Sequence, residues 1–317
     1  MTSISEQINF EKNVLLVDVS YMTYARFFAT RIWYNSRYGK EEEIDNNQDW
    51  TLNPVFMESF ERLFFDKLED FRKSNEVVPE NIVYCLDSSF QDNWRLKINE
   101  MYKGTRKTSH EKNKFNSWDI FKFVQDKLLT DKRTYEVSGL EADDIVALLV
   151  KHLKNIESEK TDNSRKTQYF ILANDKDYIQ ICNDRTHLID INGRNISEKV
   201  LTDCNNLDFL IKKILLGDKS DNIEACFMTE KMIKLAGIKS KKTELKCTPA
   251  KVRDMLANKA SYVVINMILK SLRGNEEEIK AGLELENLYF VDNQFSKNAK
   301  LIDFAQIPSC YICKCMF

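Results

Sequence analysis

Glycine and proline are scarce in this chain of 317 residues, with only 8 and 4 occurrences. Average proteins contain about 7% glycine and about 5% proline. An all-β architecture needs many turns built from these residues, so their scarcity argues against one and favours long helices. Long apolar runs are missing as well, because no stretch approaches 18 consecutive apolar residues and the opening MTSISEQINFEKN is polar and partly acidic. We therefore expect neither a membrane span nor a secretory signal.

Histidine and paired cysteines are also in short supply. The chain has three histidines, which disfavours a His-based zinc site. Its eight cysteines are mostly scattered singly, as is typical of reduced thiols rather than a disulfide framework, and we expect a cytoplasmic protein. Cys310, Cys313 and Cys315 form a C-x2-C-x-C cluster without an obvious fourth ligand, which we interpret as a frayed tail rather than a metal site.

What the chain does have is a series of short apolar runs that alternate with amphipathic segments. Apolar residues make up 43% of the chain, enough for a sizeable core. Near-continuous apolar runs predict strands that are buried on both faces, at residues 14–20, 81–89, 168–175 and 186–191. Helical spacing predicts helices at residues 54–71 and 142–156, and almost wholly helical structure from residue 207 onward. We predict an α/β fold: a central, mainly parallel sheet flanked by helices, with a helical C-terminal extension. The predicted domains are residues 1–205 and 206–317.

Acidic residues occur where the apolar runs end. Asp18 and Asp87 each close a predicted strand, and Asp175 with Asp177 closes a third. Ligands of open α/β sheets bind beyond the carboxyl ends of the strands, so these side chains should converge on one crevice. Two further acidic groups lie at a helix start and in the segment LLGDKSDN. The nine candidate metal ligands are Asp18, Asp87, Glu141, Asp143, Asp144, Asp175, Asp177, Asp218 and Asp221.

Nine negative charges in one crevice would repel each other severely near neutral pH. Divalent cations relieve this repulsion, and ligands that are all oxygen select Mg²⁺ or Mn²⁺ over zinc. Any one of these acids is, taken alone, more often a helix cap or a solvated turn residue. The prediction of a metal site therefore depends on all of these acidic residues taken together.

The net charge of −2, from 47 basic and 49 acidic residues, argues against a nucleic-acid partner, but the distribution of charge argues for one. Residues 92–122 carry eight basic and four acidic residues interleaved with aromatic side chains, and residues 229–253 carry eight basic and two acidic residues. Taken separately, each stretch could be a solvated helix face. An acidic site flanked by two basic surfaces is what a phosphodiester substrate requires, with aromatics available to stack on bases.

Six segments, in order, resemble the 5′-nuclease superfamily of flap endonucleases and 5′→3′ exonucleases, and in particular its branch of T-even-type bacteriophage ribonucleases H. They are LLVDVSYMTY, CLDSSFQDNWR, MYKGTRK, VSGLEADDIVALLV, LANDKDYIQI and LLGDKSDNI. The resemblance implies a PIN-like 5′-nuclease core and a metal-dependent phosphodiester hydrolase. Its expected activity is 5′→3′ exonuclease and flap endonuclease cleavage at the 5′ ends of DNA and RNA–DNA duplexes, which removes RNA primers in DNA replication.

The resemblance also implies roles for single residues. Two Mg²⁺ ions are expected, with Mn²⁺ as a possible substitute: Asp18, Asp87, Glu141, Asp143 and Asp144 would serve the first, and Asp175, Asp177, Asp218 and Asp221 the second. Residues 92–122 would form a basic helical arch of the catalytic core, in which Lys103 and Arg106 contact the scissile phosphate and Tyr102 stacks on a base. The expected nucleic-acid-binding residues are Arg95, Tyr102, Lys103, Arg106, Lys107, Lys239, Lys241 and Lys242.

The chain departs from the family pattern after LLGDKSDNI, where many members have a Gly-rich helix–turn–helix signature. The segment EACFMTEKMIKLAGIKSKKTELK lacks that signature, so we expect duplex binding to rest on its lysines, without a bound monovalent cation. The expected partners are double-stranded and 5′-flap DNA and RNA–DNA hybrids, with a single-strand-binding protein or a sliding clamp as a further candidate. A monomer is expected, and no membrane.

Two other functions fit the sequence less well. A haloacid-dehalogenase-type phosphohydrolase needs a D-x-D after the first strand, whereas this chain has Asp18-Val19-Ser20 there. A non-catalytic relative that only binds DNA structures would not need its carboxylates, and all of the expected ones are present.

Overall fold

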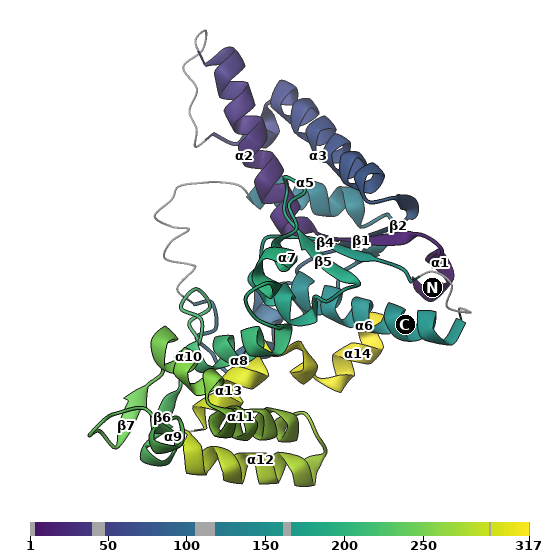
Figure 1. Cartoon of the computed structure of the whole chain (residues 1–317). Helices are drawn as coiled ribbons and strands as arrows, with labels where there is room; N and C mark the ends of the chain where they lie inside the picture. The colour runs from purple at the N-terminus through teal and green to yellow at the C-terminus, as the bar shows by residue number, and fades with distance from the viewer. Residues whose placement is uncertain (1–3, 40–47, 105–117, 161–165, 292, 317) are drawn as a thin grey trace. The chain divides into compact units, whose positions relative to one another are not determined.

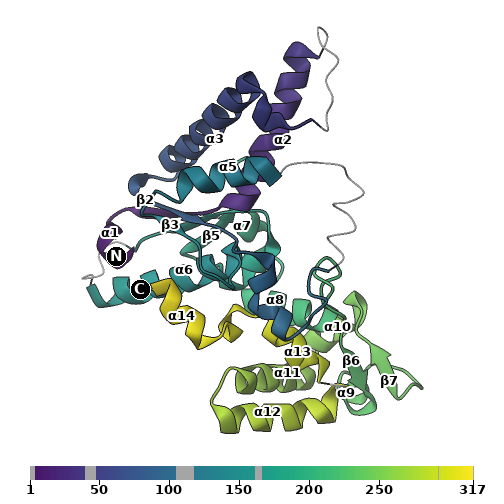
Figure 2. The same ribbon diagram turned by 180° about the vertical axis from the view of Figure 1, so that it is seen from behind.

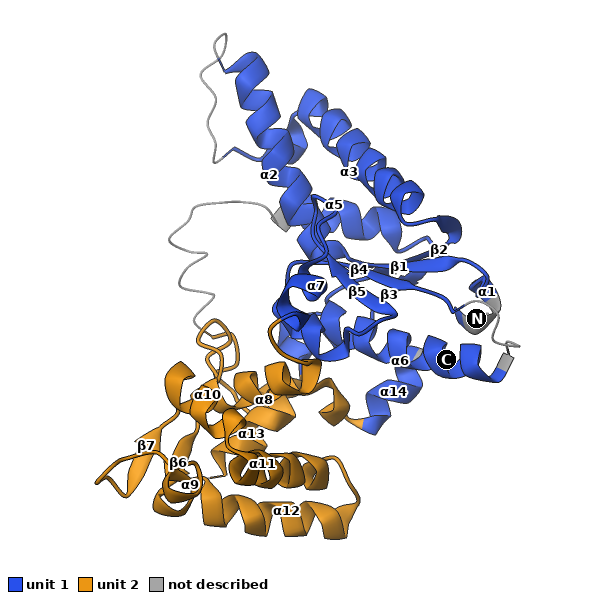
Figure 3. Cartoon of the chain, in the orientation of Figure 1, with its two compact units in different colours: residues 1–93, 108–202, 309–317 blue, residues 94–107, 203–308 orange. Residues whose placement is uncertain are grey.

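The chain is described by a computed structural model over residues 4–39, 48–104, 118–160, 166–291 and 293–316. It divides into two compact units (Figure 3). Unit 1 comprises residues 1–93, 108–202 and 309–317, and unit 2 comprises residues 94–107 and 203–308. The division near residue 202 lies close to the predicted domain boundary, while the first part of the predicted arch groups with unit 2 and the last nine residues group with unit 1.

Unit 1 is built on a sheet of five parallel strands in the order β3-β2-β1-β4-β5. The strands are β1 (Asn13–Asp18), β2 (Val77–Cys85), β3 (Thr134–Tyr135), β4 (Tyr169–Leu172) and β5 (Thr186–Ile189). The central strand is fully buried from residue 14 to residue 17, as its unbroken apolar run predicts. The predicted parallel sheet is confirmed, although β2 begins and ends four residues earlier than predicted and β3 was not predicted.

Helices cover both faces of this sheet (Figures 1 and 2). On one face lie α2 (Val19–Tyr38), α3 (Pro54–Ser74) and α5 (Trp118–Leu128), whose apolar side chains share a core with Leu15 and Val17 of β1. On the other face, α6 (Ala142–Lys160) packs against β1 and β2, with α14 (Ser309–Met316) beside it. Two shorter helices are α1 (Ile4–Gln7) and α7 (Ile196–Leu201).

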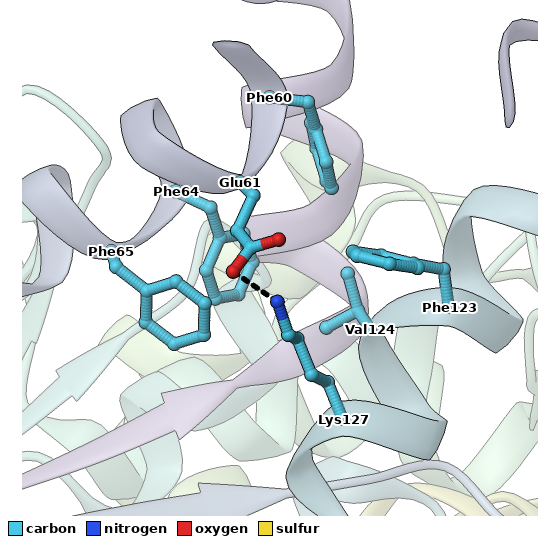
Figure 4. Close-up of a pocket in the computed structure, with 7 residues that line it drawn as sticks. All are labelled: Phe60, Glu61, Phe64, Phe65, Phe123, Val124 and Lys127. Carbon is cyan, nitrogen blue, oxygen red and sulfur yellow. Dashed lines mark ion pairs between the residues drawn. The ribbon is translucent and has the colours of Figure 1, made fainter. Parts of the chain in front are cut away.

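The helix α3 shows how local sequence sets these elements. Asn53 caps it by accepting a hydrogen bond from the Phe56 backbone N–H, and Pro54 occupies the first turn. Its aromatic stripe then faces the core. Figure 4 shows where that stripe meets α5, in a recess lined by Phe60, Phe64, Phe65, Phe123 and Val124, with an ion pair between Glu61 and Lys127 joining the two helices.

Unit 2 is mainly helical. Its helices are α8 (Asn206–Leu216), α9 (Glu230–Leu235), α10 (Pro249–Ala257), α11 (Lys259–Leu272), α12 (Glu276–Tyr289) and α13 (Gln294–Ile302). The predicted helical extension is confirmed, and it also contains an antiparallel pair of short strands that was not predicted, β6 (Phe227–Thr229) and β7 (Glu244–Lys246). Strands of three residues are too short to show an alternating pattern. The core includes Ile211, Met228, Ile265 and Phe295.

The cysteine-rich segment is the helix α14, so its interpretation as a frayed tail was wrong. Tyr311 and Cys315 are four residues apart and therefore share one helix face, and both are buried. Cys310 and Cys313 are exposed. Among the described helices, none combines the length and apolar character that crossing a bilayer requires.

Candidate functional site

Three carboxylates lie at the same edge of the unit 1 sheet. Asp18 is the last residue of β1, Asp87 follows β2 by two residues, and Asp175 follows β4 by three. The strands β2, β1 and β4 are neighbours and run in parallel, so their carboxyl ends meet. The negative charges of Asp87 and Asp175 both raise the pKa of Asp18. The structure thus brings together the carboxylates that the sequence placed at strand ends.

Asp18 is held in position from two directions. Its Oδ1 accepts a hydrogen bond from the Tyr21 backbone N–H at 3.0 Å, which caps α2, and its Oδ2 accepts one from the Tyr178 hydroxyl at 3.1 Å. Burial, and then the negative charge of Asp87, raise the pKa of Asp18 to about 7, although both hydrogen bonds lower it. Without a cation, this carboxyl is therefore held against like charge in a poorly solvated place.

Asp87 ties the end of β2 to the start of α6. Its Oδ1 accepts a hydrogen bond from the Ala142 backbone N–H at 2.8 Å, and its Oδ2 accepts one from the Ser20 hydroxyl. The helix N-terminus offers free N–H groups and a positive dipole end, which favour negative charge there. The Asp87 carboxylate thereby joins the segment after β2 to the first turn of α6.

The start of α6 carries a compact carboxylate cluster. Glu141, Asp143 and Asp144 each offer one oxygen, and these oxygens lie within 4.8 Å of one another. The Asp144 Oδ2 accepts from the Glu141 backbone N–H at 3.2 Å, and the Asp143 Oδ1 accepts from the Asp144 backbone N–H at 2.7 Å. Hard oxygen donors at this spacing fit a divalent cation such as Mg²⁺ or Mn²⁺.

Asp175 and Asp177 lie on the turn after β4. Asp175 caps the short helix Lys176–Ile181 by accepting a hydrogen bond from the Asp177 backbone N–H at 2.9 Å. Asp175 is exposed and Asp177 half-buried. Capping fixes the Asp175 side chain and leaves carboxylate oxygens for a ligand.

Asp218 and Asp221 lie in unit 2, on the turn after α8, and offer oxygens within 4.8 Å of each other. The turn is closed by two backbone hydrogen bonds between Asp218 and Ile223. Gly217 precedes it with φ of 66°, and a Cβ there would lie 2.4 Å from the Ile223 carbonyl oxygen. Only glycine fits this position.

The charge balance at Asp218 differs from that at Asp18. Its Oδ1 accepts hydrogen bonds from the Ser220 backbone N–H at 2.8 Å and hydroxyl at 2.6 Å, and its Oδ2 pairs with the Lys213 Nζ at 3.1 Å. Burial raises the pKa of Asp218, but the Ser220 hydrogen bonds and the Lys213 charge outweigh burial and hold it below the ordinary value.

Within unit 2, the segment around Lys103 is fastened to the Asp218–Asp221 turn. The Lys103 backbone N–H donates to the Asp221 carbonyl oxygen at 3.0 Å, and the Asn222 side chain donates to the Met101 carbonyl oxygen at 3.0 Å. Lys103 and Asn222 both have positive φ, 52° and 59°, a conformation that non-glycine residues rarely adopt. The predicted catalytic Lys103 is therefore fixed beside a predicted metal ligand.

Two predicted DNA-binding residues are buried instead. Arg95 is 3% exposed, and its Nε donates to the Leu301 carbonyl oxygen at 2.8 Å. Tyr102 is also 3% exposed, with its ring in the unit 2 core and its hydroxyl 3.4 Å from the Asp221 Oδ2. Both side chains are buried in the part of the chain that the structure describes, and DNA contact by Arg95 and base stacking by Tyr102 stay predictions.

The remaining predicted residues fall into two groups. Arg106 and Lys107 lie outside the described residues. Lys239, Lys241 and Lys242 are exposed in the loop between α9 and β7. The loop carries no acidic residue.

Sequence reasoning missed the side chains that hold the carboxylates. Tyr178 reads as a core aromatic and Ser20 as a turn residue, although their hydroxyls donate to Asp18 and Asp87. Sequence reasoning also did not place Cys315 near Asp144. Burial, and then the negative charge of Asp144, raise the pKa of the Cys315 thiol to about 12, which shows that the two side chains interact. Only the position of Tyr178 directly after the D-K-D motif gave a local signal.

The chain was compared with known families and proteins. The family model described as 5′-3′ exonuclease, N-terminal resolvase-like domain, matches residues 13–207, which include all the predicted carboxylates of unit 1. The 5′-3′ exonuclease of Buchnera aphidicola subsp. Schizaphis graminum (strain Sg) is 28% identical over 148 residues, 45% of this chain and 47% of that protein. DNA polymerase I of Streptococcus pneumoniae (strain ATCC BAA-255 / R6) is 26% identical over 223 residues, 67% of this chain and 22% of that protein. The chain thus matches about half of the first relative and less of the second.

Solved structures confirm the predicted fold class. The D15 protein of T5, co-crystallised with metal ions, superposes with a TM-score of 0.56 at 15% identity, covering 96% of this chain and 92% of that one. The bacteriophage T5 D15 flap endonuclease in a complex with DNA and metal ions gives a TM-score of 0.52 at 15% identity, with coverage of 96% and 92%. At this identity the likeness concerns the fold.

Proposed function

The chain belongs to the family of 5′-3′ exonuclease N-terminal resolvase-like domains, and on that premise we propose that it is a metal-dependent 5′→3′ exonuclease and flap endonuclease. The observation that carries this proposal is the carboxylate cluster Glu141, Asp143 and Asp144 beside the strand-end residues Asp18 and Asp87. Two independent local features, a helix start and two strand ends, supply acids to one edge of the sheet. A purely structural role gives no reason for that concentration of like charge.

The proposed cofactor is Mg²⁺, with Mn²⁺ as a substitute, in two sites. The close oxygen donors and the raised pKa of Asp18 both fit a divalent cation, because a cation would offset burial and the Asp87 charge. We assign the first ion to Asp18, Asp87, Glu141, Asp143 and Asp144, and the second to Asp175, Asp177, Asp218 and Asp221. When bound, such a pair supplies an activated water and stabilises charge on the attacking and leaving oxygens of the phosphodiester.

The chain's own groups prepare this site. The hydroxyls of Tyr178 and Ser20 and the backbone N–H of Ala142 fix the Asp18 and Asp87 carboxylates before a ligand arrives. Preorganised ligands lose little conformational entropy on binding. Lys103, fixed by its backbone to Asp221, is proposed to place its ammonium near the scissile phosphate and stabilise the charge of the transition state. Arg106 is proposed for the same task.

The proposed substrates are duplexes with a 5′ flap, 5′ DNA ends and RNA–DNA hybrids, in the removal of RNA primers during DNA replication. Lys239, Lys241 and Lys242 support binding to a duplex backbone, because three exposed ammonium groups lie within four residues of each other. We propose a cytoplasmic monomer that works with a single-strand-binding protein or a sliding clamp.

The proposal is tested with a duplex that carries a labelled 5′ flap of DNA, a labelled 5′ RNA segment or a blunt 5′ end. Each is incubated with Mg²⁺, Mn²⁺ or EDTA. We expect short 5′ products with either metal and none in EDTA. Products cut at the flap junction indicate endonuclease action, and products of one or a few nucleotides indicate exonuclease action. Tight binding of the flap in Mg²⁺ without any product would instead show a non-catalytic DNA-binding relative.

A further inference from the structure

A glycine turn precedes the carboxylate cluster of α6, and a side chain of α14 presses on it. Gly139 has φ of 93°, a conformation that strongly favours glycine. A Cβ at this position would lie 2.6 Å from the Tyr311 Cε1 and 2.7 Å from its hydroxyl oxygen. The edge of the Tyr311 ring therefore occupies the space that a side chain at residue 139 would need. Tyr311 itself is 9% exposed.

The same turn is also held by Ser88, which follows β2 by three residues. The Gly139 backbone N–H donates to the Ser88 hydroxyl at 3.0 Å, and that hydroxyl donates to the Leu140 carbonyl oxygen at 2.8 Å. The Ser88 backbone N–H donates to the same carbonyl at 3.1 Å. The hydrogen bonds of the Ser88 hydroxyl and backbone N–H and the packing of Tyr311 together hold this turn in place.

This turn ends where the proposed metal ligands begin. Leu140 is fully buried, and the next residue, Glu141, donates its backbone N–H to the Asp144 carboxylate at 3.2 Å. A displacement of residues 139–140 would move Glu141 directly and would disturb the hydrogen bond that orients Asp144. In Figures 1 and 2, α14 lies beside α6 in both views, and the two helices contact each other.

We propose that Tyr311 is a positioning residue for this site: its ring, packed on Gly139, holds the turn that places Glu141 and Asp144 for a divalent cation. The inference rests on the proposed metal-dependent function, but it concerns a residue outside the motifs of residues 14–223. It gives α14 a function, since the helix supports the ligand turn from a distant part of the sequence.

The test compares Tyr311→Ala with Tyr311→Phe, which keeps the ring, and with Cys313→Ala on the exposed face of the same helix. For each variant, Mn²⁺ affinity is measured by electron paramagnetic resonance of free Mn²⁺, and thermal unfolding is followed in EDTA. Flap cleavage at saturating Mn²⁺ is measured separately. We expect about tenfold weaker Mn²⁺ binding for Tyr311→Ala, at the low end of the effect of supporting residues. Tyr311→Phe and Cys313→Ala should stay within about twofold of the unaltered chain.

Two results would overturn the proposal: unchanged Mn²⁺ affinity in Tyr311→Ala, or equal losses in Tyr311→Ala and Tyr311→Phe. A lower unfolding temperature with normal Mn²⁺ affinity shows a structural role only and also overturns it. If Tyr311→Ala does not fold, Tyr311→Leu takes its place with the same criteria. Because the affinity is read without a nucleic acid, a chain that binds Mn²⁺ but never cleaves would end the nuclease proposal and leave this test standing.

Discussion

Two carboxylates of the candidate site, Asp18 in unit 1 and Asp218 in unit 2, are perturbed in opposite directions. Asp18 lies half-buried next to Asp87, and its pKa is raised to about 7. Asp218 is also partly buried, but Ser220 and Lys213 hold its pKa below the ordinary value. Both carboxylates accept hydrogen bonds, but burial and the charge of Asp87 prevail at Asp18, whereas the Ser220 hydrogen bonds and the Lys213 cation prevail over burial at Asp218.

The difference shows how the two units divide the work in the proposed function. The acidic edge of unit 1 is a place that a divalent cation would stabilise, as expected of a catalytic metal centre. The Asp218 turn of unit 2 already has its charge compensated, and the same unit carries the exposed lysines at residues 239, 241 and 242. In the proposed function we therefore assign the chemistry to unit 1 and substrate binding to unit 2.

The largest expected effect is on cleavage when a unit 1 carboxylate is made neutral. Asp143→Asn and Asp175→Asn should each lower the rate of flap cleavage in Mg²⁺ by about a hundredfold or more, because each removes a charged ligand from the proposed centre. Both amides can still accept the hydrogen bonds of their local turns, so thermal unfolding in EDTA should change little. Asp66→Asn, on the exposed face of α3, is the control. Full activity in both site variants would contradict the proposed metal centre.

The next effect separates substrate binding from chemistry. Replacing Lys239, Lys241 and Lys242 by alanine should weaken duplex binding and reduce the slope of log K against log salt by about 0.9 for each lysine that contacts a phosphate. Binding is measured by fluorescence anisotropy in Ca²⁺ or EDTA at several salt concentrations. The matched control replaces three exposed lysines of α11 and α12, Lys259, Lys270 and Lys280. Equal losses in the two triple variants would show a nonspecific charge effect.

The opposite pKa shifts predict opposite pH dependences of stability in EDTA. The folded pKa of Asp18 lies above the unfolded value of 3.8, so the native state binds its proton more tightly, and stability should fall as pH rises from about 4 to about 7. The folded pKa of Asp218 lies below 3.8, so its contribution is present above that pH and is lost as pH falls further. Asp18→Asn should flatten the first slope, by at most about 4 kcal/mol, and Asp218→Asn the second.

The measurement is urea unfolding, followed by circular dichroism, between about pH 3 and about pH 8, a range that includes the pH dependences of both Asp18 and Asp218. A decline with rising pH that persists unchanged in Asp18→Asn would assign it to other groups and break the comparison. Saturating Mg²⁺ should abolish the decline in the unaltered chain, because a bound cation favours the ionised carboxylates.

The smallest effect concerns Glu286, a buried carboxyl of α12 that is not among the candidate ligands. Its Oε1 accepts from the Ser296 backbone N–H at 2.8 Å, its Oε2 has no hydrogen-bond partner among the described residues, and burial raises its pKa. Stability should therefore fall as pH rises through that folded pKa, and Glu286→Gln should remove this dependence. Mn²⁺ affinity and cleavage should stay unchanged. Loss of metal binding in Glu286→Gln would contradict the assignment of the site to the strand ends.

Much of the fold was predictable because its signals are local. The apolar run at residues 14–17 is unbroken, and its strand is fully buried in a parallel sheet. The carboxylates of unit 1 could be predicted for the same reason, since each follows a strand or lies at the start of a helix, and parallel topology brings the strand ends together. The two-stranded sheet of unit 2 could not, because three-residue strands show no periodicity.

The supporting contacts were out of reach of sequence reasoning because they join distant parts of the chain. Tyr178 donates to Asp18 over 160 positions, and Tyr311 packs on Gly139. The basic charge of Arg95 predicted a DNA contact, but its guanidinium lies on the Trp94 ring, with 4.8 Å to the ring centroid, and satisfies a backbone carbonyl. Composition and charge patterns show that such residues are present, but not whether their side chains face the solvent or the core.

The most direct test of the account is to locate the metal. Crystals of the chain grown with Mn²⁺ and without chelator would be measured at the manganese absorption edge, and an anomalous difference map would be calculated. The account predicts a strong peak bounded by Asp18, Asp87, Glu141, Asp143 and Asp144, and a second peak near Asp175 and Asp177. A map without a peak at the first group of carboxylates, at a Mn²⁺ concentration that supports flap cleavage, would contradict it.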